Sequence, residues 1–117
     1  MNSFRHTVTD RGDHVLLSLM GDLDLSAYTA LVAQLTTLIG VGHAVVIDCS
    51  GVTFLDSMGL RALVEGLHAA EDAGLGLELT GPSDPVLRVL ELSGTTGLFK
   101  IRDEAADAPA SPDVSEF

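Results

Sequence analysis

Residues 44–60, AVVIDCSGVTFLDSMGL, decide the fold of this chain. The stretch begins with an apolar run at 44–47 that has no polar face, which is typical of a central strand in a largely parallel sheet. From Met58 onward the apolar residues recur at intervals of three and four, which predicts an amphipathic helix. A buried strand that passes through a short loop into a helix is typical of the α/β class.

The same alternation extends to both sides of this stretch. Strands are predicted at 4–9, 14–20, 44–48, 76–80 and 98–101. Helices are predicted at 28–40, 58–74 and 84–94, each ending at a glycine, and Asp84 is expected to cap the last one ahead of Pro85. The order β-β-α-β-α-β-α-β predicts a mixed, largely parallel sheet with an N-terminal antiparallel hairpin, covered by helices.

Composition and charge divide the chain into two parts. The length of 117 residues suits one domain, which we place at 1–102. Residues 103–117 carry five acids, two prolines and no base, and we predict a disordered acidic tail there. The net charge of −11 argues against nucleic acid or an anionic membrane as a partner. A partner protein with a basic patch fits this charge better.

Other features favour the cytoplasm. No apolar run approaches the roughly 18 residues of a membrane span, and the N-terminus lacks the apolar core of a signal peptide. The lone Cys49 has no partner for an internal disulfide, which fits a reducing compartment. Its simplest interpretation is a small buried hydrophobic residue.

Patterns of catalytic and cofactor-binding residues are sparse, and we predict neither enzymatic activity nor a cofactor. The four histidines lie in different elements, and with one cysteine they do not make a zinc site. No phosphate-binding or dinucleotide-binding glycine motif is present. Ser57 is not part of a nucleophile elbow, because Leu55 stands where a glycine is required.

The acidic pair Asp22 and Asp24 has two interpretations. Two carboxylates after a strand can hold Mg²⁺ or act as nucleophile and acid. The alternative is a polar loop in which Asp24 or Ser26 caps the following helix. We favour the loop, because no lysine and second acidic pair follow in suitable loops.

Ser57 lies at the start of the helix that follows the central strand. Serine and aspartate are favoured caps there, so Asp56 and Ser57 have a structural explanation. The positive helix end and its free N–H groups also favour an anion. A phosphoserine would add about −1.5 to −2 charges, which the helix tolerates and a docking surface does not.

Several segments together resemble one family. They are Gly-Asp-Leu-Asp at 21–24, Val-Val-Ile-Asp at 45–48, VTFLDSMGL at 52–60, Leu-Ser-Gly at 92–94 and LFKI at 98–101. In this order and spacing they resemble the STAS domain of anti-sigma factor antagonists, the sporulation stage II AA-like proteins. The Asp-Ser-x-Gly segment at 56–59 is the most specific part.

The resemblance implies a partner-switching regulator with the STAS fold. The unphosphorylated protein would bind an anti-sigma factor that is also a Ser/Thr kinase and so free the sigma factor. Phosphorylation at Ser57 would switch it off, and a Ser/Thr phosphatase would reset it. Asp24, Asp56, Met58 and Gly59 are the expected partner-binding residues, with Met58 and Leu55 as apolar contacts if exposed.

Two other functions remain open. STAS domains also serve as scaffolds or accessory subunits of stressosome-like or lipid-transport assemblies. A Ser- or Asp-dependent hydrolase would need a general base within reach of Ser57, and the neighbouring sequence offers none.

Overall fold

The computed structural model describes residues 2–102, and the predicted tail at 103–117 lies outside them. The strands are β1 (Arg5–Asp10), β2 (Val15–Leu23), β3 (Val45–Leu55) and β4 (Leu77–Thr80). The helices are α1 (Leu25–Gly40), α2 (Ser57–Asp72) and α3 (Asp84–Ser93), followed by the short 3₁₀ helix η1 (Thr96–Leu98).

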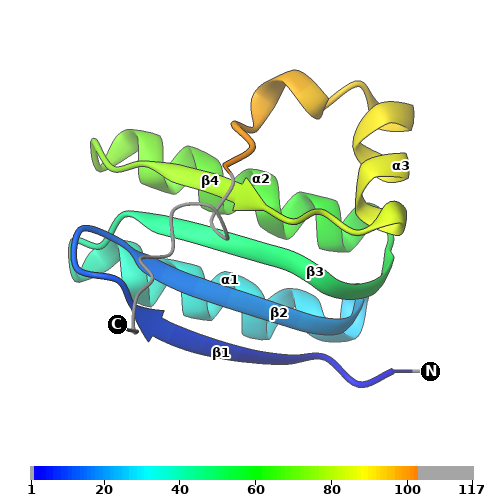
Figure 1. Cartoon of the computed structure of the whole chain (residues 1–117), viewed down its shortest axis with the longest axis horizontal. Helices are drawn as coiled ribbons and strands as arrows, with labels where there is room; N and C mark the ends of the chain where they lie inside the picture. Colours follow the sequence, from blue (N-terminus) through cyan, green and yellow to red (C-terminus); the bar gives the residue numbers. More distant parts are fainter. Residues whose placement is uncertain (1, 103–117) are drawn as a thin grey trace, which may run out of the picture.

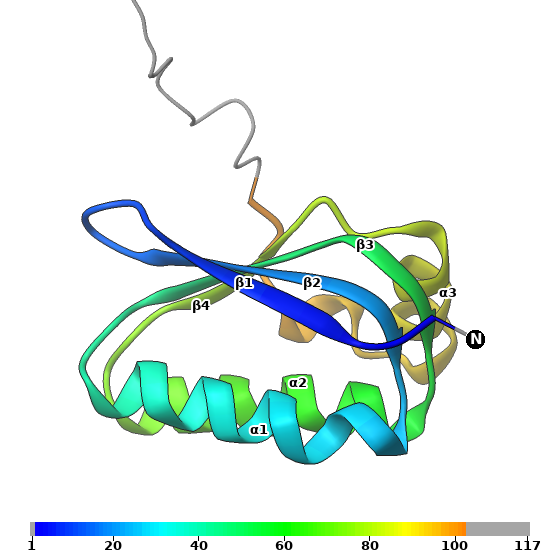
Figure 2. The same cartoon turned by 90° about the horizontal axis from the view of Figure 1, so that it is seen from below.

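The four strands form one sheet in the order β1-β2-β3-β4 (Figure 1). β1 is antiparallel to β2, and the pairs β2–β3 and β3–β4 are parallel. This confirms the predicted mixed sheet with its N-terminal hairpin. Helices α1 and α2 cover the same face, and α3 lies at the carboxyl end of the parallel strands (Figure 2). Within residues 2–102 no helix covers the other face.

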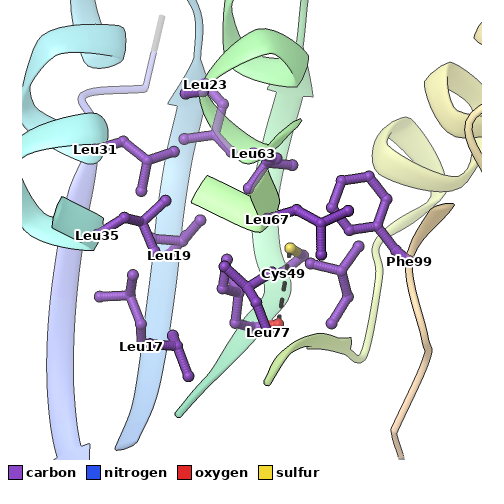
Figure 3. Close-up of a cluster of buried hydrophobic side chains, with 14 of the residues drawn as sticks. Leu17, Leu19, Leu23, Leu31, Leu35, Cys49, Leu63, Leu67, Leu77 and Phe99 are labelled. Atoms are coloured by element: carbon purple, nitrogen blue, oxygen red, sulfur yellow. Dashed lines mark hydrogen bonds between the residues drawn. The ribbon is translucent and has the colours of Figure 1, made fainter. Parts of the chain in front are cut away.

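The core lies between the sheet and the α1–α2 layer and is almost entirely aliphatic. Leucines of β2, α1 and α2 meet there, joined by Phe99 from the segment after α3 (Figure 3). Cys49 of β3 is fully buried among them, and its thiol donates toward the carbonyl of Ile47 at 4.0 Å. The prediction of a buried structural cysteine is confirmed.

The prediction of a fifth strand at 98–101 is wrong. Leu98 ends η1, and Ile101 makes one isolated parallel bridge with Leu79. Leu79 donates its N–H to the carbonyl of Lys100 at 2.9 Å. Phe99 turns into the core while Leu98 and Ile101 stay half exposed. This segment is therefore held by one buried side chain and not by a ladder of strand hydrogen bonds.

The helix starts also differ from the prediction. Asp24, one of the two predicted caps, caps α1, but this helix begins at Leu25, three residues before Tyr28. Ser83 occupies the cap position of α3, which makes Asp84 the first helical residue. The Ser83 hydroxyl donates to the carbonyl of Val52 at 2.7 Å, so it ties α3 to β3 and does not cap the helix. Among residues 2–102, no helix is both long and apolar enough to cross a membrane.

Candidate functional site

The candidate site is built on the carboxyl ends of β2 and β3. Because these strands are parallel and in register at Leu23 and Leu55, the loops that follow them lie side by side. The Asp56 N–H donates to the Leu23 carbonyl at 3.2 Å across this junction. Each loop passes directly into a helix, so α1 and α2 begin at the same edge of the sheet (Figure 2).

An aspartate caps each of these two helices. Asp56 Oδ1 accepts from the backbone N–H groups of Met58 at 2.9 Å and Gly59 at 3.0 Å. Asp24 Oδ1 accepts from the backbone N–H of Ser26 at 3.0 Å and from its hydroxyl at 2.6 Å. The hydroxyl bond from Ser26 is the main cause that holds the pKa of Asp24 below its ordinary value. Both carboxylates therefore stabilise helix starts at this edge.

Ser57 is the first residue of α2 and is exposed. Within residues 2–102 its hydroxyl makes no hydrogen bond. A group that approaches from solvent can reach this oxygen without breaking an existing contact.

The amides near Ser57 are less available than expected. Asp56 already binds the N–H groups of Met58 and Gly59, and the Leu60 N–H donates to the Asp56 carbonyl at 3.0 Å. The helix start is therefore largely satisfied by its own cap. An anion on Ser57 would lie next to the Asp56 carboxylate and would need a positively charged side chain to balance it.

The apolar surface at this edge differs from the expected one. Leu55 is only 4% exposed, so it belongs to the core and the expectation of a Leu55 contact is wrong. Met58 is half-buried. The exposed apolar residues are Leu25 at 67% and Phe54 at 49%, which the sequence analysis did not single out. The alternation of β3, with Leu55 inward, is the signal that places Phe54 outward.

Gly59 is buried where two backbones approach each other. A Cβ at this position would lie 2.2 Å from the Leu23 carbonyl oxygen and 2.6 Å from Leu55 Cδ1. Only glycine permits α2 to pass this close to the end of β2. Gly59 therefore sets how closely the start of α2, which includes Ser57, approaches the end of β2.

The expectation that Asp22 lies in a loop is wrong. Asp22 lies in β2 and is buried. Its carboxylate accepts from the Thr53 hydroxyl at 2.7 Å and from the Asn2 backbone N–H at 3.2 Å. It therefore ties the N-terminal segment and β3 to β2. In residues 2–102 there is no group of three or more metal-ligating side chains.

A polar cluster that the sequence did not reveal joins α1 to α2. The Tyr28 hydroxyl donates to Glu65 Oε1, and Arg61 Nε donates to Glu65 Oε2 at 2.8 Å. The Arg61 guanidinium lies 6.0 Å from the centre of the Tyr28 ring. The hydrogen bond to Glu65 raises the pKa of Tyr28, and the bonds from Tyr28 and Arg61 lower the pKa of Glu65.

A hollow of about 350 Å³ lies on the α3 side of the β3 end. Its lining combines the last residues of β3 with the first two turns of α3: Thr53, Phe54, Leu55, Asp84, Pro85, Arg88 and Val89. The exposed Phe54 and the start of α3 therefore line the same hollow.

Comparison with known proteins identifies the family. Residues 6–101 match the family model described as Mlab, STAS domain. The chain belongs to the STAS domain family.

Solved structures with the same fold include several anti-sigma factor antagonists. One from Mycobacterium paratuberculosis is 24% identical, with 90% of each chain covered and a TM-score of 0.77. SpoIIAA in its unphosphorylated form is 22% identical, with 88% of this chain and 92% of that chain covered and a TM-score of 0.74. The Bacillus SpoIIAA in the phosphorylated form is 24% identical, with 90% and 97% covered and a TM-score of 0.67. This STAS domain thus resembles anti-sigma factor antagonists in fold.

Proposed function

We propose that this STAS domain is a cytoplasmic anti-sigma factor antagonist controlled by phosphorylation of Ser57. The unphosphorylated form binds an anti-sigma factor that is a Ser/Thr kinase, and the sigma factor is released. A Ser/Thr phosphatase restores the binding form. The observation that carries the proposal is the exposed Ser57 hydroxyl, which starts α2 beside the Asp24 and Asp56 caps and has no hydrogen bond within residues 2–102.

The switch acts through charge at a contact surface. Leu25 and Met58, in the first turns of α1 and α2, supply apolar area at the sheet edge where Ser57 lies, and Asp24 and Asp56 supply acidic groups for a basic partner. A phosphate of about −1.5 to −2 charges would be placed inside this contact. Removing such a charge from water when the partner docks costs several kcal/mol. A cost of roughly 3 kcal/mol weakens binding about a hundredfold, so no change of fold is needed.

The chain itself supplies no catalytic residue in this mechanism. The kinase partner performs the phosphoryl transfer, and Ser57 is its substrate. Asp24 and Asp56 fix the two helix starts that present the hydroxyl. Gly59 allows the close approach of α2 to β2 that sets its position.

The test uses Ser57 variants and candidate anti-sigma factor kinases. Ser57→Ala is expected to bind a cognate kinase at wild-type affinity and to accept no phosphate by intact mass. Ser57→Asp is expected to lose binding about a hundredfold while its thermal unfolding stays that of a folded domain. Ser26→Ala is the matched control, because Ser26 is an exposed serine in the first turn of α1. It should be phosphorylated like the wild type. Phosphate on the Ser57→Ala variant would contradict the assignment.

A second candidate is an accessory subunit of a lipid-transport or stressosome-like assembly. The observation that favours it is the description of the matching family model, which names Mlab. Affinity purification of the tagged chain from its native cells separates the two. Recovery of transport ATPase subunits or of large oligomers, in place of a small kinase, would support this second function.

A further inference from the structure

We propose that Arg61 is the side chain that binds a phosphate on Ser57, and that phosphorylation withdraws Arg61 from Glu65. This inference rests on the proposed phosphorylation of Ser57. It identifies how the domain itself accommodates the added charge.

The spacing on α2 places Arg61 one helical turn from both Ser57 and Glu65. Ser57, Arg61 and Glu65 are successive residues at intervals of four, so they share one face of the helix. Arg61 now reaches forward one turn, and its Nε lies 2.8 Å from Glu65 Oε2. Its side chain is 63% exposed, so it is free to turn back toward Ser57. An acid that precedes its base by four residues is also the favoured order on a helix.

The two helices that begin at the candidate site offer few cations for a phosphate. Across α1 and α2, Arg61 is the one Lys or Arg residue. Asp24 and Asp56 place two negative charges at the same edge, and the Asp56 carboxylate already holds the amides of Met58 and Gly59. A phosphate on Ser57 therefore needs a side-chain cation, and Arg61 is the one that these two helices supply.

The phosphate is also the stronger partner for Arg61. It carries about −1.5 to −2 charges against the single charge of Glu65. Guanidinium and phosphate oxygens can form two parallel hydrogen bonds. Glu65 retains the bond from Tyr28 when Arg61 leaves, so this exchange does not leave Glu65 without a hydrogen bond.

The exchange carries the effect of phosphorylation along the helix surface. Arg61 would leave its position 6.0 Å from the centre of the Tyr28 ring and expose the charge of Glu65, two turns from Ser57. A partner that covers both α1 and α2 would then meet a changed surface well beyond the phosphate.

The experiment measures the second pKa of phosphoserine by phosphorus NMR. Phosphoserine is incorporated at position 57 during translation, so no kinase is needed. Arg61→Gln is expected to raise this pKa by about 0.2 to 0.7 of a pH unit, because an exposed cation contributes at that level. Lys100→Gln removes the same charge from another exposed site beside β4 and should leave the pKa unchanged.

A second measurement needs no variant. The Arg61 Nε–H proton should shift between the unmodified and the phosphoserine-containing protein. Equal phosphoserine pKa values in the wild type and Arg61→Gln, together with an unmoved Arg61 signal, would overturn the inference. Failure of every kinase to label Ser57 would count against the proposed function instead, since the translated phosphoserine tests Arg61 separately.

Discussion

Cys49 and Ser57 lie eight residues apart and have opposite chemical availability. Cys49 is fully buried in β3, and burial, with a smaller contribution from Asp48, raises the pKa of its thiol to about 12. It therefore stays a protonated thiol at neutral pH and is shielded from reagents. Ser57 follows the end of the same strand and is exposed. The difference depends on where the chain leaves the sheet: Cys49 lies within β3, and Ser57 follows the end of this strand with its side chain exposed.

Tyr28 gives a direct test of the polar cluster, because it is the one tyrosine of the chain and tryptophan is absent. Its pKa is raised mainly by the hydrogen bond to Glu65, while the charge of Arg61 acts in the opposite direction. Glu65→Gln should lower the pKa of Tyr28 toward its ordinary value of 10.0, as measured by the ultraviolet absorbance of the phenolate.

The sign of the stability effect follows from the direction of the shift. A raised Tyr28 pKa means that the folded state holds the phenol proton more tightly than the unfolded chain does. The associated stability is complete below the unfolded pKa and is lost as the pH rises through the folded pKa. Glu71→Gln, an exposed change on the same helix, is the control and should leave the Tyr28 titration unmoved. An unchanged pKa in Glu65→Gln would show that the hydrogen bond does not persist in solution.

At the scale of elements, α1 and α2 begin in the same way. Each follows a strand of the parallel pair, and each is capped by an aspartate that accepts from the first-turn N–H groups. The strand register sets the two starts next to each other. Gly59 then determines how closely α2 approaches the end of β2.

Gly59→Ala is expected to destabilise the domain by about 1–3 kcal/mol, the range for overpacking. The added Cβ would meet the Leu23 carbonyl at 2.2 Å, and backbone cannot move aside as a flexible side chain can. Chemical denaturation measures the loss. Gly40→Ala is the control, because a Cβ there meets nothing within 4 Å and the position ends α1. Equal stability of the two variants would mean that the α2 start adjusts freely.

At the scale of the whole molecule, the segment after α3 closes the core. Phe99 is the aromatic residue of the buried cluster and enters from the end of the described chain (Figure 3). The backbone that follows it is joined to β4 through one bridge, between Ile101 and Leu79. The domain thus relies on a side-chain anchor where a fifth strand was predicted.

Phe99→Ala should cost about 3–5 kcal/mol, because it removes a buried aromatic ring and leaves a cavity. A domain of this size has a total stability of about 5–15 kcal/mol, so the loss should be large in urea denaturation. Leu98→Ala changes an exposed neighbour and should stay within about 0.5 kcal/mol of the wild type. Similar midpoints for both variants would contradict the anchoring role of Phe99.

Much of the fold was predictable because the apolar period changes clearly along the chain. The two-faced apolar run before Asp48 indicated a central strand, and the intervals of three and four after Met58 indicated α2. The prediction of a fifth strand failed because local propensity does not reveal that Phe99 turns inward while Leu98 does not. The prediction that Asp84 caps α3 was wrong, because Ser83 occupies the cap position. The Ser83 hydroxyl is held there by the Val52 carbonyl of β3, which is distant in sequence.

The candidate site was predictable in part. Sequence alone placed Ser57 and the Asp56 cap at a helix start, and the structure agrees. It did not reveal the burial of Leu55 or the exposure of Leu25, because both depend on how the loop turns after the strand. The Tyr28–Glu65–Arg61 cluster was hidden because Tyr28 lies 37 residues from its partner Glu65.

The sharing of one sheet edge by both helix starts has an evolutionary consequence. The side chains that the proposed function assigns to partner binding lie at the helix starts on this edge, while those of the buried core lie between the sheet and the helices. If the proposed function holds, substitutions at the exposed Leu25 or the half-buried Met58 would alter which partner is accepted while the buried core stays unchanged. Duplicated copies of such a gene could diverge into insulated signalling pairs by drift at this edge alone.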